Sequence, residues 1–182
     1  MIRSRRPDLV GWTTSHRRRD DGATESTQRA IVTGPVAERS PEGAAALGAA
    51  YWRAVAQTTA GLIARRESDA GSELRLGRRG PALLRFGPAR YDVTATGVSA
   101  AYPITGGLLA RRPSGSLTLS MEMEDRGGQV ELRSAIAGYY PTLAARPGAP
   151  AWTGEAYNQV QARLHARVSR SYFRHVARGA PV

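Results

Sequence analysis

The chain has 182 residues, of which 41% are hydrophobic and 23% charged, and its formal net charge is +11 at pH 7. This length allows one compact domain with its own core, and this composition excludes wholesale disorder. Cysteine is absent, which excludes disulfides, thiolate metal sites and thiol nucleophiles. We therefore expect a cytoplasmic protein, without a signal peptide and without a membrane span, because no apolar run approaches about 18 residues.

All 26 lysine-plus-arginine positions are arginines. Two interpretations are open. A GC-rich genome favours arginine, alanine and glycine codons over lysine codons, and would produce this composition without any functional need. Alternatively, guanidinium groups serve here in bidentate recognition of anions or in stacking on aromatic rings, which an ammonium does poorly. The composition fits both interpretations equally.

Residues 1–28 contain two basic clusters, the second of which, Arg17–Arg19, is followed directly by Asp20 and Asp21. Neither a helical nor a strand period extends through this segment. We therefore predict a flexible basic arm over residues 1–28, followed by a single α+β domain over residues 29–182.

The first predicted elements of the domain are a short β-prone run at residues 29–34 and a helix that begins near Pro41. Ser40 precedes that proline and is a suitable N-terminal cap for the helix. Apolar residues then recur mostly at four-residue steps as far as Arg66. This pattern predicts either one helix or a helix pair divided near Gly61.

Between residues 73 and 143, short apolar runs separated by glycine and proline predict six or seven antiparallel strands. The clearest alternation runs over residues 116–124, and residues 129–140 repeat it after a turn that contains Gly127 and Gly128. These two segments predict a long β-hairpin.

A long final helix is predicted over residues 153–178, which contain only one glycine and no proline in that helical stretch. Apolar side chains at three- and four-residue steps form one stripe along it, and His175 lies within the stripe. The apolar members of the stripe are Tyr157, Val160, Leu164, Val168, Tyr172 and Val176.

A second stripe on the same predicted helix consists only of arginines, and no acidic residue interrupts it. Like charges at these spacings repel by roughly 0.2–0.5 kcal/mol per pair, so the stripe needs acids from elsewhere, the helix dipole or an anionic partner. It is either a solvated face or an anion site for phosphate-bearing ligands, nucleic acid or acidic membrane. The candidate anion-binding residues are Arg163, Arg167, Arg170 and Arg174, followed by Arg178.

No catalytic, metal-binding or nucleotide-binding motif is present, and we predict neither a metal nor a cofactor. The three histidines lack metal-ligand spacing, and Gly106–Gly107 lacks the remainder of a phosphate-binding loop. A histidine and several tyrosines are candidates for a general acid or base in a cavity. The sequence does not decide whether the chain is an enzyme. These candidates are His175, Tyr139, Tyr140, Tyr157 and Tyr172.

The order of elements over residues 29–178 resembles that of the START and Bet v 1 (SRPBCC, helix-grip) superfamily, as do the stretches AYPITGGLLARRPSGSLTLS and AGYYPTLAARPGAP before the final helix. This resemblance implies a curved antiparallel sheet wrapped around the C-terminal helix, with an apolar cavity between them that holds lipid- or polyketide-like molecules. It also implies ligand contacts from the helix and the long hairpin. The residues implied are Met121, Met123, Leu132, Ile136, Leu164, Val168, Tyr172 and His175.

Two other architectures fit the same pattern: an antiparallel barrel with helices outside it, and an α+β sheet with helices on one face. The leading functional hypothesis is a binding protein, or a modest enzyme, for a hydrophobic small molecule. A nucleic-acid-binding protein that uses the arginine stripe and a structural or interaction subunit without a ligand are the alternatives. The oligomeric state is not predicted.

Overall fold

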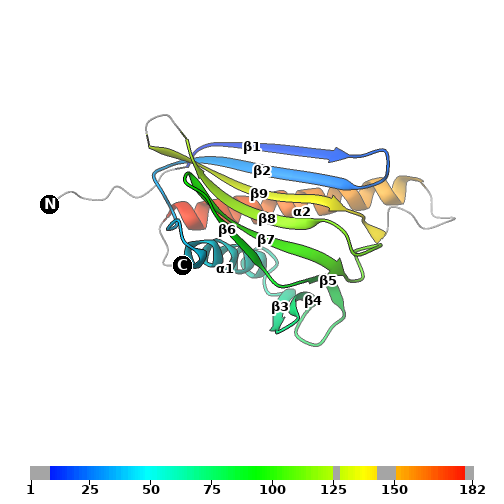
Figure 1. Cartoon of the computed structure of the whole chain (residues 1–182). Coiled ribbons are helices and arrows are strands. Elements are labelled where there is room, and N and C mark those ends of the chain that lie inside the picture. The colour runs from blue at the N-terminus through cyan, green and yellow to red at the C-terminus, as the bar shows by residue number, and fades with distance from the viewer. Residues whose placement is uncertain (1–8, 125–127, 143–150, 179–182) are drawn as a thin grey trace.

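The computed structural model describes residues 9–124, 128–142 and 151–178, with the backbone alone from 151 to 162. Within these residues the fold is α+β, with nine antiparallel strands in one open sheet and two helices (Figure 1). The strand order is β1-β2-β9-β8-β7-β5-β4-β3, and β6 pairs with β7 outside this path. The elements are β1 Leu9–Arg18, β2 Thr24–Thr33, α1 Pro41–Thr58, β3 Ile63–Ser68, β4 Gly71–Leu76, β5 Ala82–Phe86, β6 Arg90–Val93, β7 Gly97–Gly106, β8 Ser116–Met123, β9 Gln129–Tyr139 and α2 Ala151–Ala177.

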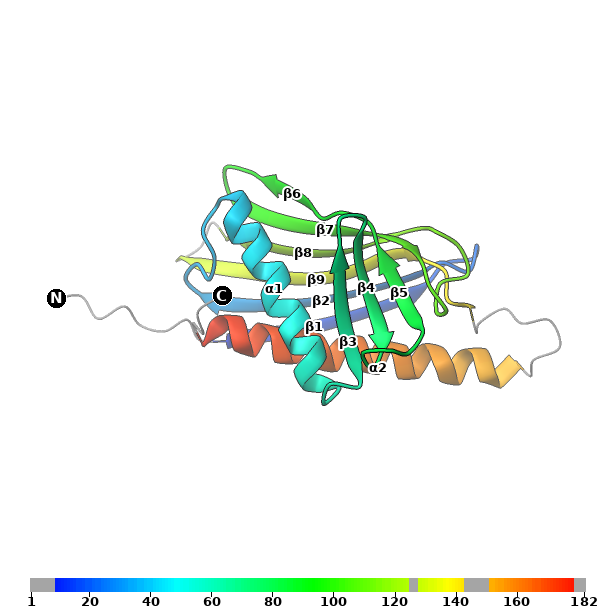
Figure 2. The ribbon, with the colours of Figure 1, turned by 90° about the horizontal axis from the view of Figure 1, so that it is seen from below.

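The two helices lie on the same side of the sheet (Figure 2). Helix α2 runs beside β1 and β2, whereas α1 lies across the strands and contacts α2. Strands β3 to β5 turn away from the direction of the longer strands and lie next to α1. This arrangement is consistent with a helix-grip fold, the first of the three architectures that the sequence pattern allowed. Neither helix has the combination of length and apolar character needed to cross a membrane.

Residues 9–28, interpreted above as part of a flexible arm, instead form β1 and the first half of β2. Strand β1 is an edge strand whose residues pair antiparallel with β2, from Leu9 opposite Val32 to Arg18 opposite Thr24. Most of its side chains are exposed. Few of its side chains besides Trp12 pack against the core, so its sequence carries no apolar alternation, and the backbone pairing with β2 makes it a strand.

Helix α1 begins as predicted but ends earlier. The Ser40 side chain accepts a hydrogen bond from the Gly43 amide at 3.1 Å, which caps the first turn. The predicted continuation to Arg66 is wrong, and α1 is a single helix that ends at Thr58. Gly61 has φ +76°, a conformation that ends the helix, and the chain enters β3, whose backbone bonds to β4 compensate for the lost helical ones.

The long hairpin and the final helix are confirmed. Strands β8 and β9 pair antiparallel, with Leu119 opposite Ser134 and Met121 opposite Leu132. Residues 125–127 of the predicted turn lie outside the described residues. The predicted inward side chains of β8 are buried as far as Met121, whereas Met123 at its end is 40% exposed. The sheet therefore presents its apolar face to α1 and α2.

Close packing of α1 on β7 gives a testable prediction. Gly48 is in the middle of α1, where alanine normally stabilises a helix, but a Cβ at this position would collide with the Tyr102 hydroxyl. We expect Gly48→Ala to lower the free energy of unfolding by roughly 1–3 kcal/mol.

The same substitution in a Tyr102→Phe background tests this explanation, because the phenylalanine lacks the colliding oxygen. Urea unfolding of the four proteins of this double-mutant cycle should then show at least half of the loss recovered. An equal loss in both backgrounds would mean that Tyr102 is not the obstacle.

Candidate functional site

An apolar cavity of about 100 Å³ lies in the interior between the two helices, β9 and the β3–β5 strands. A smaller one of about 50 Å³ shares Tyr51, Leu74, Leu84 and Ile136 with it. The first cavity is bounded mainly by aliphatic side chains that come from every surrounding element. They include Ile63, Leu74, Leu83, Leu84, Ile136 and Leu164.

These aliphatic side chains remain incompletely buried although they face the interior. Ile63, Leu74 and Ile136 are half-buried, and Leu164 on α2 is 37% exposed. Native interiors are normally packed to the density of organic crystals. The incomplete burial therefore shows that these side chains are not fully packed by the protein itself and that the cavity is partly open to solvent.

A β-bulge increases the apolar area that β5 presents to the cavity. In the pairing of β4 with β5, Leu74 lies opposite Leu84, but the next residue, Arg75, lies opposite Ala82. The register therefore shifts by one residue, and Leu83 has no residue opposite it. In a regular strand, successive side chains point to opposite faces. The bulge removes this restriction, and both Leu83 and Leu84 line the cavity.

Besides Thr59, two polar side chains line the cavity, Tyr51 of α1 and His165 of α2. The His165 ring is held between two serines, with Nδ1 at 3.1 Å from the Ser26 Oγ and Nε2 at 3.2 Å from the Ser134 Oγ. Ser169, one turn further along α2, donates to the Ser134 Oγ at 3.2 Å. A buried polar network thus connects β2, β9 and α2 at one end of an otherwise apolar cavity.

The network extends beyond the serines to the edge of the sheet. Gln28 donates from Nε2 to the Ser26 Oγ at 3.3 Å, and its Oε1 accepts from the Thr14 hydroxyl of β1 at 2.6 Å. Gln28 is completely buried. Buried polar groups of this kind are tolerated only when they are hydrogen-bonded, and these are.

Burial determines the protonation state of both polar side chains. Desolvation lowers the pKa of His165 to about 4, with a smaller contribution from the charge of His16. Burial also raises the pKa of Tyr51, against the opposing effect of a hydrogen bond with Ser134. At neutral pH both groups are therefore uncharged hydrogen-bonding groups.

Each ring nitrogen of His165 has a serine hydroxyl within hydrogen-bonding distance. A neutral imidazole donates through one nitrogen and accepts through the other, and a serine hydroxyl can take either role. The two serines therefore satisfy both ring nitrogens of the neutral histidine in either tautomer.

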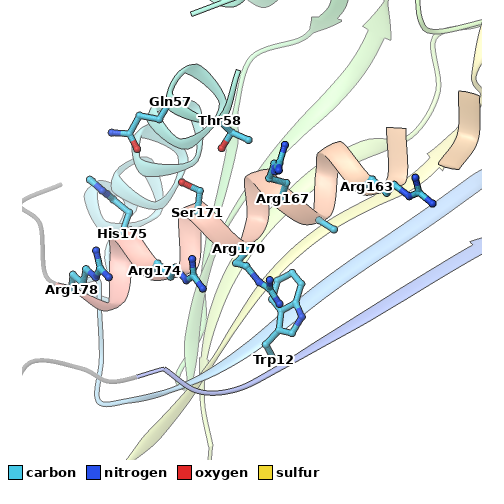
Figure 3. Close-up of a pocket in the computed structure, with 11 residues that line it drawn as sticks. Trp12, Gln57, Thr58, Arg163, Arg167, Arg170, Ser171, Arg174, His175 and Arg178 are labelled. Carbon is cyan, nitrogen blue, oxygen red and sulfur yellow. The ribbon is translucent and has the colours of Figure 1, made fainter. Parts of the chain in front are cut away.

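A second hollow, a groove of about 760 Å³, lies on the outer face of α2 (Figure 3). Gln57 and Thr58 at the end of α1 lie on one side of the helix and Trp12 of β1 on the other. We call this hollow the arginine groove, because four arginines of α2 and the arginine directly after it line it. They are Arg163, Arg167, Arg170, Arg174 and Arg178.

No protein-family profile matches the chain, and no curated protein matches it. Similar solved structures include Ara h 8.0201, at 12% identity over 82% of this chain and 99% of that chain, with a TM-score of 0.35. The Mll3558 protein from Rhizobium loti has 15% identity over 82% and 98% of the two chains, with a TM-score of 0.37. Major latex-like protein 151 from Panax ginseng has 15% identity over 82% and 97%, with a TM-score of 0.32. All three TM-scores are below 0.5, and the identities do not exceed 15%.

The residues implied as ligand contacts lie in four different places. Three of them, Ile136, Leu164 and Val168, line the interior cavity. His175 lines the arginine groove on the outside of α2, and Met123 is exposed at the end of β8. The remaining three lie in the packed core and line neither hollow. They are Met121, Leu132 and Tyr172.

Two of the tyrosines considered for acid–base chemistry have hydroxyl groups that are engaged elsewhere. The Tyr139 hydroxyl donates to the Leu109 carbonyl at 2.5 Å, although its ring borders the smaller cavity. The Tyr140 hydroxyl donates to Asp21 Oδ2 at 2.9 Å. Tyr172 packs edge-on against Tyr51, with 5.6 Å between ring centroids. The side chain of Tyr157 lies outside the described residues.

The sequence analysis did not single out His165 with Ser26 and Ser134 as a site. A signal for it existed in β9, where Ser134 occupies an inward position between Leu132 and Ile136. A second signal existed in β2, where Ser26 and Gln28 take inward positions that a purely structural strand fills with apolar residues. Polar residues at inward strand positions indicate a buried network, but not its partner on a helix.

Proposed function

We propose that the chain binds a hydrophobic small molecule in the interior between the sheet and α2. The observation that carries this proposal is the ring of incompletely buried aliphatic side chains around the cavity, from Ile63 on β3 to Leu164 on α2. Burying such apolar area contributes about 25 cal/mol per Å², so an apolar ligand that covers it gains affinity directly.

The polar end of the cavity indicates the chemistry of the ligand. Tyr51 and His165 are both neutral at physiological pH, for the reasons given above, so this end does not attract a carboxylate. Because Ser26 and Ser134 occupy both ring nitrogens of His165, the Tyr51 hydroxyl is the group proposed to meet an uncharged hydroxyl or carbonyl of the ligand. The serines behind His165 fix its ring orientation. The proposed ligand is therefore mainly apolar and carries at least one neutral polar group.

The cavity has to widen when such a ligand binds, because pockets for small molecules typically measure about 300–1,000 Å³. The β3–β5 strands are the part proposed to move, since β5 pairs with β7 only at Arg85–Gly106 and Phe86–Ile104. Two further backbone bonds, from the Leu108 and Leu109 amides to the Ala82 and Leu83 carbonyls, would have to adjust. Outward movement of these strands would withdraw Leu74 and Leu84 from the cavity and enlarge it.

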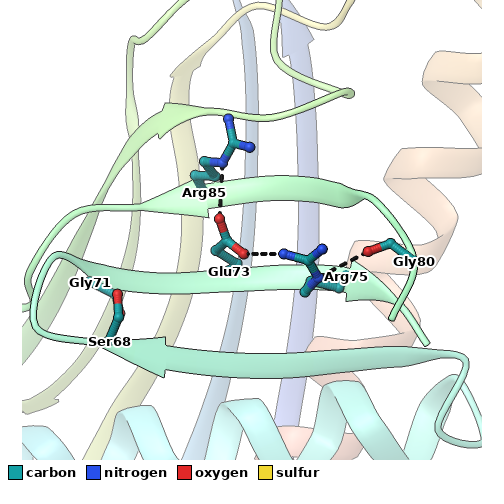
Figure 4. A network of polar contacts seen from close by, with 6 residues as sticks. All are labelled: Ser68, Gly71, Glu73, Arg75, Gly80 and Arg85. Atoms are coloured by element: carbon teal, nitrogen blue, oxygen red, sulfur yellow. Dashed lines mark hydrogen bonds and ion pairs between the residues drawn. The ribbon is translucent and has the colours of Figure 1, made fainter. Parts of the chain in front are cut away.

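A polar network on the outer face of these strands supports their movement as one unit (Figure 4). Glu73 of β4 accepts from Arg75 Nη1 at 2.6 Å and from Arg85 Nε of β5 at 3.0 Å. These two hydrogen bonds, that of Arg75 first, hold the pKa of the Glu73 carboxyl below its ordinary value. Arg75 also donates to the Gly80 carbonyl at 2.9 Å. The carboxylate therefore links β4, β5 and the turn between them.

The proposal is tested with N-phenyl-1-naphthylamine, a neutral apolar probe whose fluorescence rises in an apolar site and which has no charge for the arginine groove. Leu84→Trp fills the cavity with a larger side chain and should weaken probe binding at least tenfold. Leu76→Trp is the matched control, because Leu76 lies on the neighbouring strand, is 52% exposed and borders neither cavity.

Thermal unfolding followed by circular dichroism shows that each variant is folded at the titration temperature. The proposal predicts a saturable fluorescence increase with the wild type and with Leu76→Trp. It is contradicted if the wild type gives no increase, or if Leu84→Trp binds the probe as tightly as Leu76→Trp does.

A further inference from the structure

The five arginines of the arginine groove form an unneutralised row along α2. Arg163 and Arg178 at its ends are separated by about 22 Å, at 1.5 Å per helical residue, and all five side chains are exposed. In the described part of the chain, acidic side chains pair with Arg19, Arg29, Arg65, Arg75 and Arg85, and with none of the five. Their mutual repulsion is therefore not relieved by carboxylates of these residues.

The groove also contains an aromatic ring within reach of a ligand. Trp12 is half-buried, its inner side packs edge-on against Phe173 with 5.9 Å between centroids, and the Arg170 guanidinium lies 5.1 Å from its ring centroid. Base stacking on an aromatic ring beside guanidinium groups is how many proteins hold unpaired nucleotides. The combination is more specific than a positive surface alone.

The edge strand adds a further positive charge at the Arg163 end of the groove. Trp12 contacts Phe173, near the end of α2. His16, which follows Trp12 on β1, lies near His165, which precedes Phe173 on α2, because its charge acts on the His165 ring. Strand β1 thus runs antiparallel to α2. Because side chains alternate along a strand, Arg18 is on the same face of β1 as Trp12 and His16.

Two other anionic partners fit the groove less well. A helix that docks on an acidic membrane inserts its apolar face into the lipid, but the apolar side chains of α2, such as Val168, Phe173 and Val176, are buried in the protein. A ligand with a single phosphate would occupy only two or three guanidiniums of a row about 22 Å long. A chain of phosphates uses the whole row.

We propose that the arginine groove binds single-stranded nucleic acid, with successive phosphates along its five arginines and a base stacked against Trp12. This site is separate from the interior cavity. It can exist whether or not the cavity holds a hydrophobic ligand.

The test is a fluorescence-anisotropy titration of the full chain with a labelled oligothymidylate of about 12 nucleotides, within the range of known site sizes. Five phosphate contacts predict a slope of about −3.5 for log K against log salt, or roughly 100-fold weaker binding for a fourfold rise in salt. Unlabelled oligothymidylate should also quench tryptophan fluorescence, and Trp12→Phe should remove most of that quenching.

A matched pair of variants separates the groove from net charge. The triple variant Arg167→Glu, Arg170→Glu, Arg174→Glu should bind at least 30-fold more weakly than the wild type. The triple variant Arg78→Glu, Arg79→Glu, Arg90→Glu carries the same change in net charge at exposed positions outside the groove. It should bind less than threefold more weakly. Because all six arginines are exposed, both variants are expected to fold, and thermal unfolding verifies this.

Three results would overturn the proposal. Equal weakening in the two triple variants would show that net charge alone attracts the oligonucleotide. Tighter binding of a duplex of the same length would exclude a single-strand site. Stronger, arginine-dependent binding to phosphatidylserine vesicles than to the oligonucleotide would assign the groove to membranes instead.

Discussion

Replacing Phe173 by alanine is expected to lower the free energy of unfolding by about 3–5 kcal/mol, the usual cost of truncating a fully buried phenylalanine. Phe173 has no exposed surface and packs against Trp12 of β1 and Tyr172 of α2, with 5.9 and 5.2 Å between ring centroids. It is therefore the main apolar contact that holds the edge strand β1 against the helix. Urea unfolding measures the loss.

The position of Phe173 predicts a local effect besides the global one. Without its ring, Trp12 loses its aromatic partner on α2, so backbone amides of β1 should exchange with solvent faster relative to those of β8 and β9. Phe173→Leu is the control, because it retains most of the volume and should cost less than about 1.5 kcal/mol. A loss below about 1 kcal/mol for Phe173→Ala would show that this contact is not important for stability.

Acidification is expected to destabilise the protein through His165, and a His165→Gln variant should lack this part of the pH dependence. The pKa of His165 is about 4 in the folded chain, against an ordinary value of 6.5. Between these two values, the unfolded chain binds a proton that the folded chain does not. Stability is therefore lost as pH falls from 6.5 to about 4, at roughly 1.4 kcal/mol per pH unit and about 3 kcal/mol in total.

Urea unfolding at pH 7, 5.5 and 4.5 measures this effect as a difference between the wild type and His165→Gln. Every other titrating group is present in both proteins, so the carboxylates cancel in the comparison. At pH 7 the variant should be about 1–2 kcal/mol less stable, since glutamine replaces only part of the hydrogen bonding with Ser26 and Ser134. Parallel pH profiles for the two proteins would contradict a buried, neutral His165.

The pH dependence bears on the proposed ligand site. His165 stays neutral because it is buried, with Ser26 and Ser134 at its two ring nitrogens. Its protonation would place a charge at the polar end of the cavity, which is unfavourable next to Leu164 and Val168. Weaker binding of the neutral probe below pH 5 is therefore part of the same expectation.

The sequence by itself determined the elements whose side chains follow a local period. The alternation of Leu117, Leu119 and Met121 predicted the β8–β9 hairpin, and Ser40 before Pro41 predicted where α1 begins. The arginines of α2 could also be placed on one face from their spacing alone. These features depend on residues a few positions apart, and the geometry of one strand or one helical turn relates such residues directly.

The tertiary structure alone decided the features that depend on distant partners. Strand β1 exists because β2 offers it a ladder of backbone hydrogen bonds, and α1 ends before β3 because β4 pairs with the residues that follow Gly61. Ser26 and His165 are 139 positions apart, and they meet only through the register of the sheet and the rotation of α2 upon it. Local periodicity determines which face of an element is apolar, but only packing of the whole chain determines which polar groups meet within it.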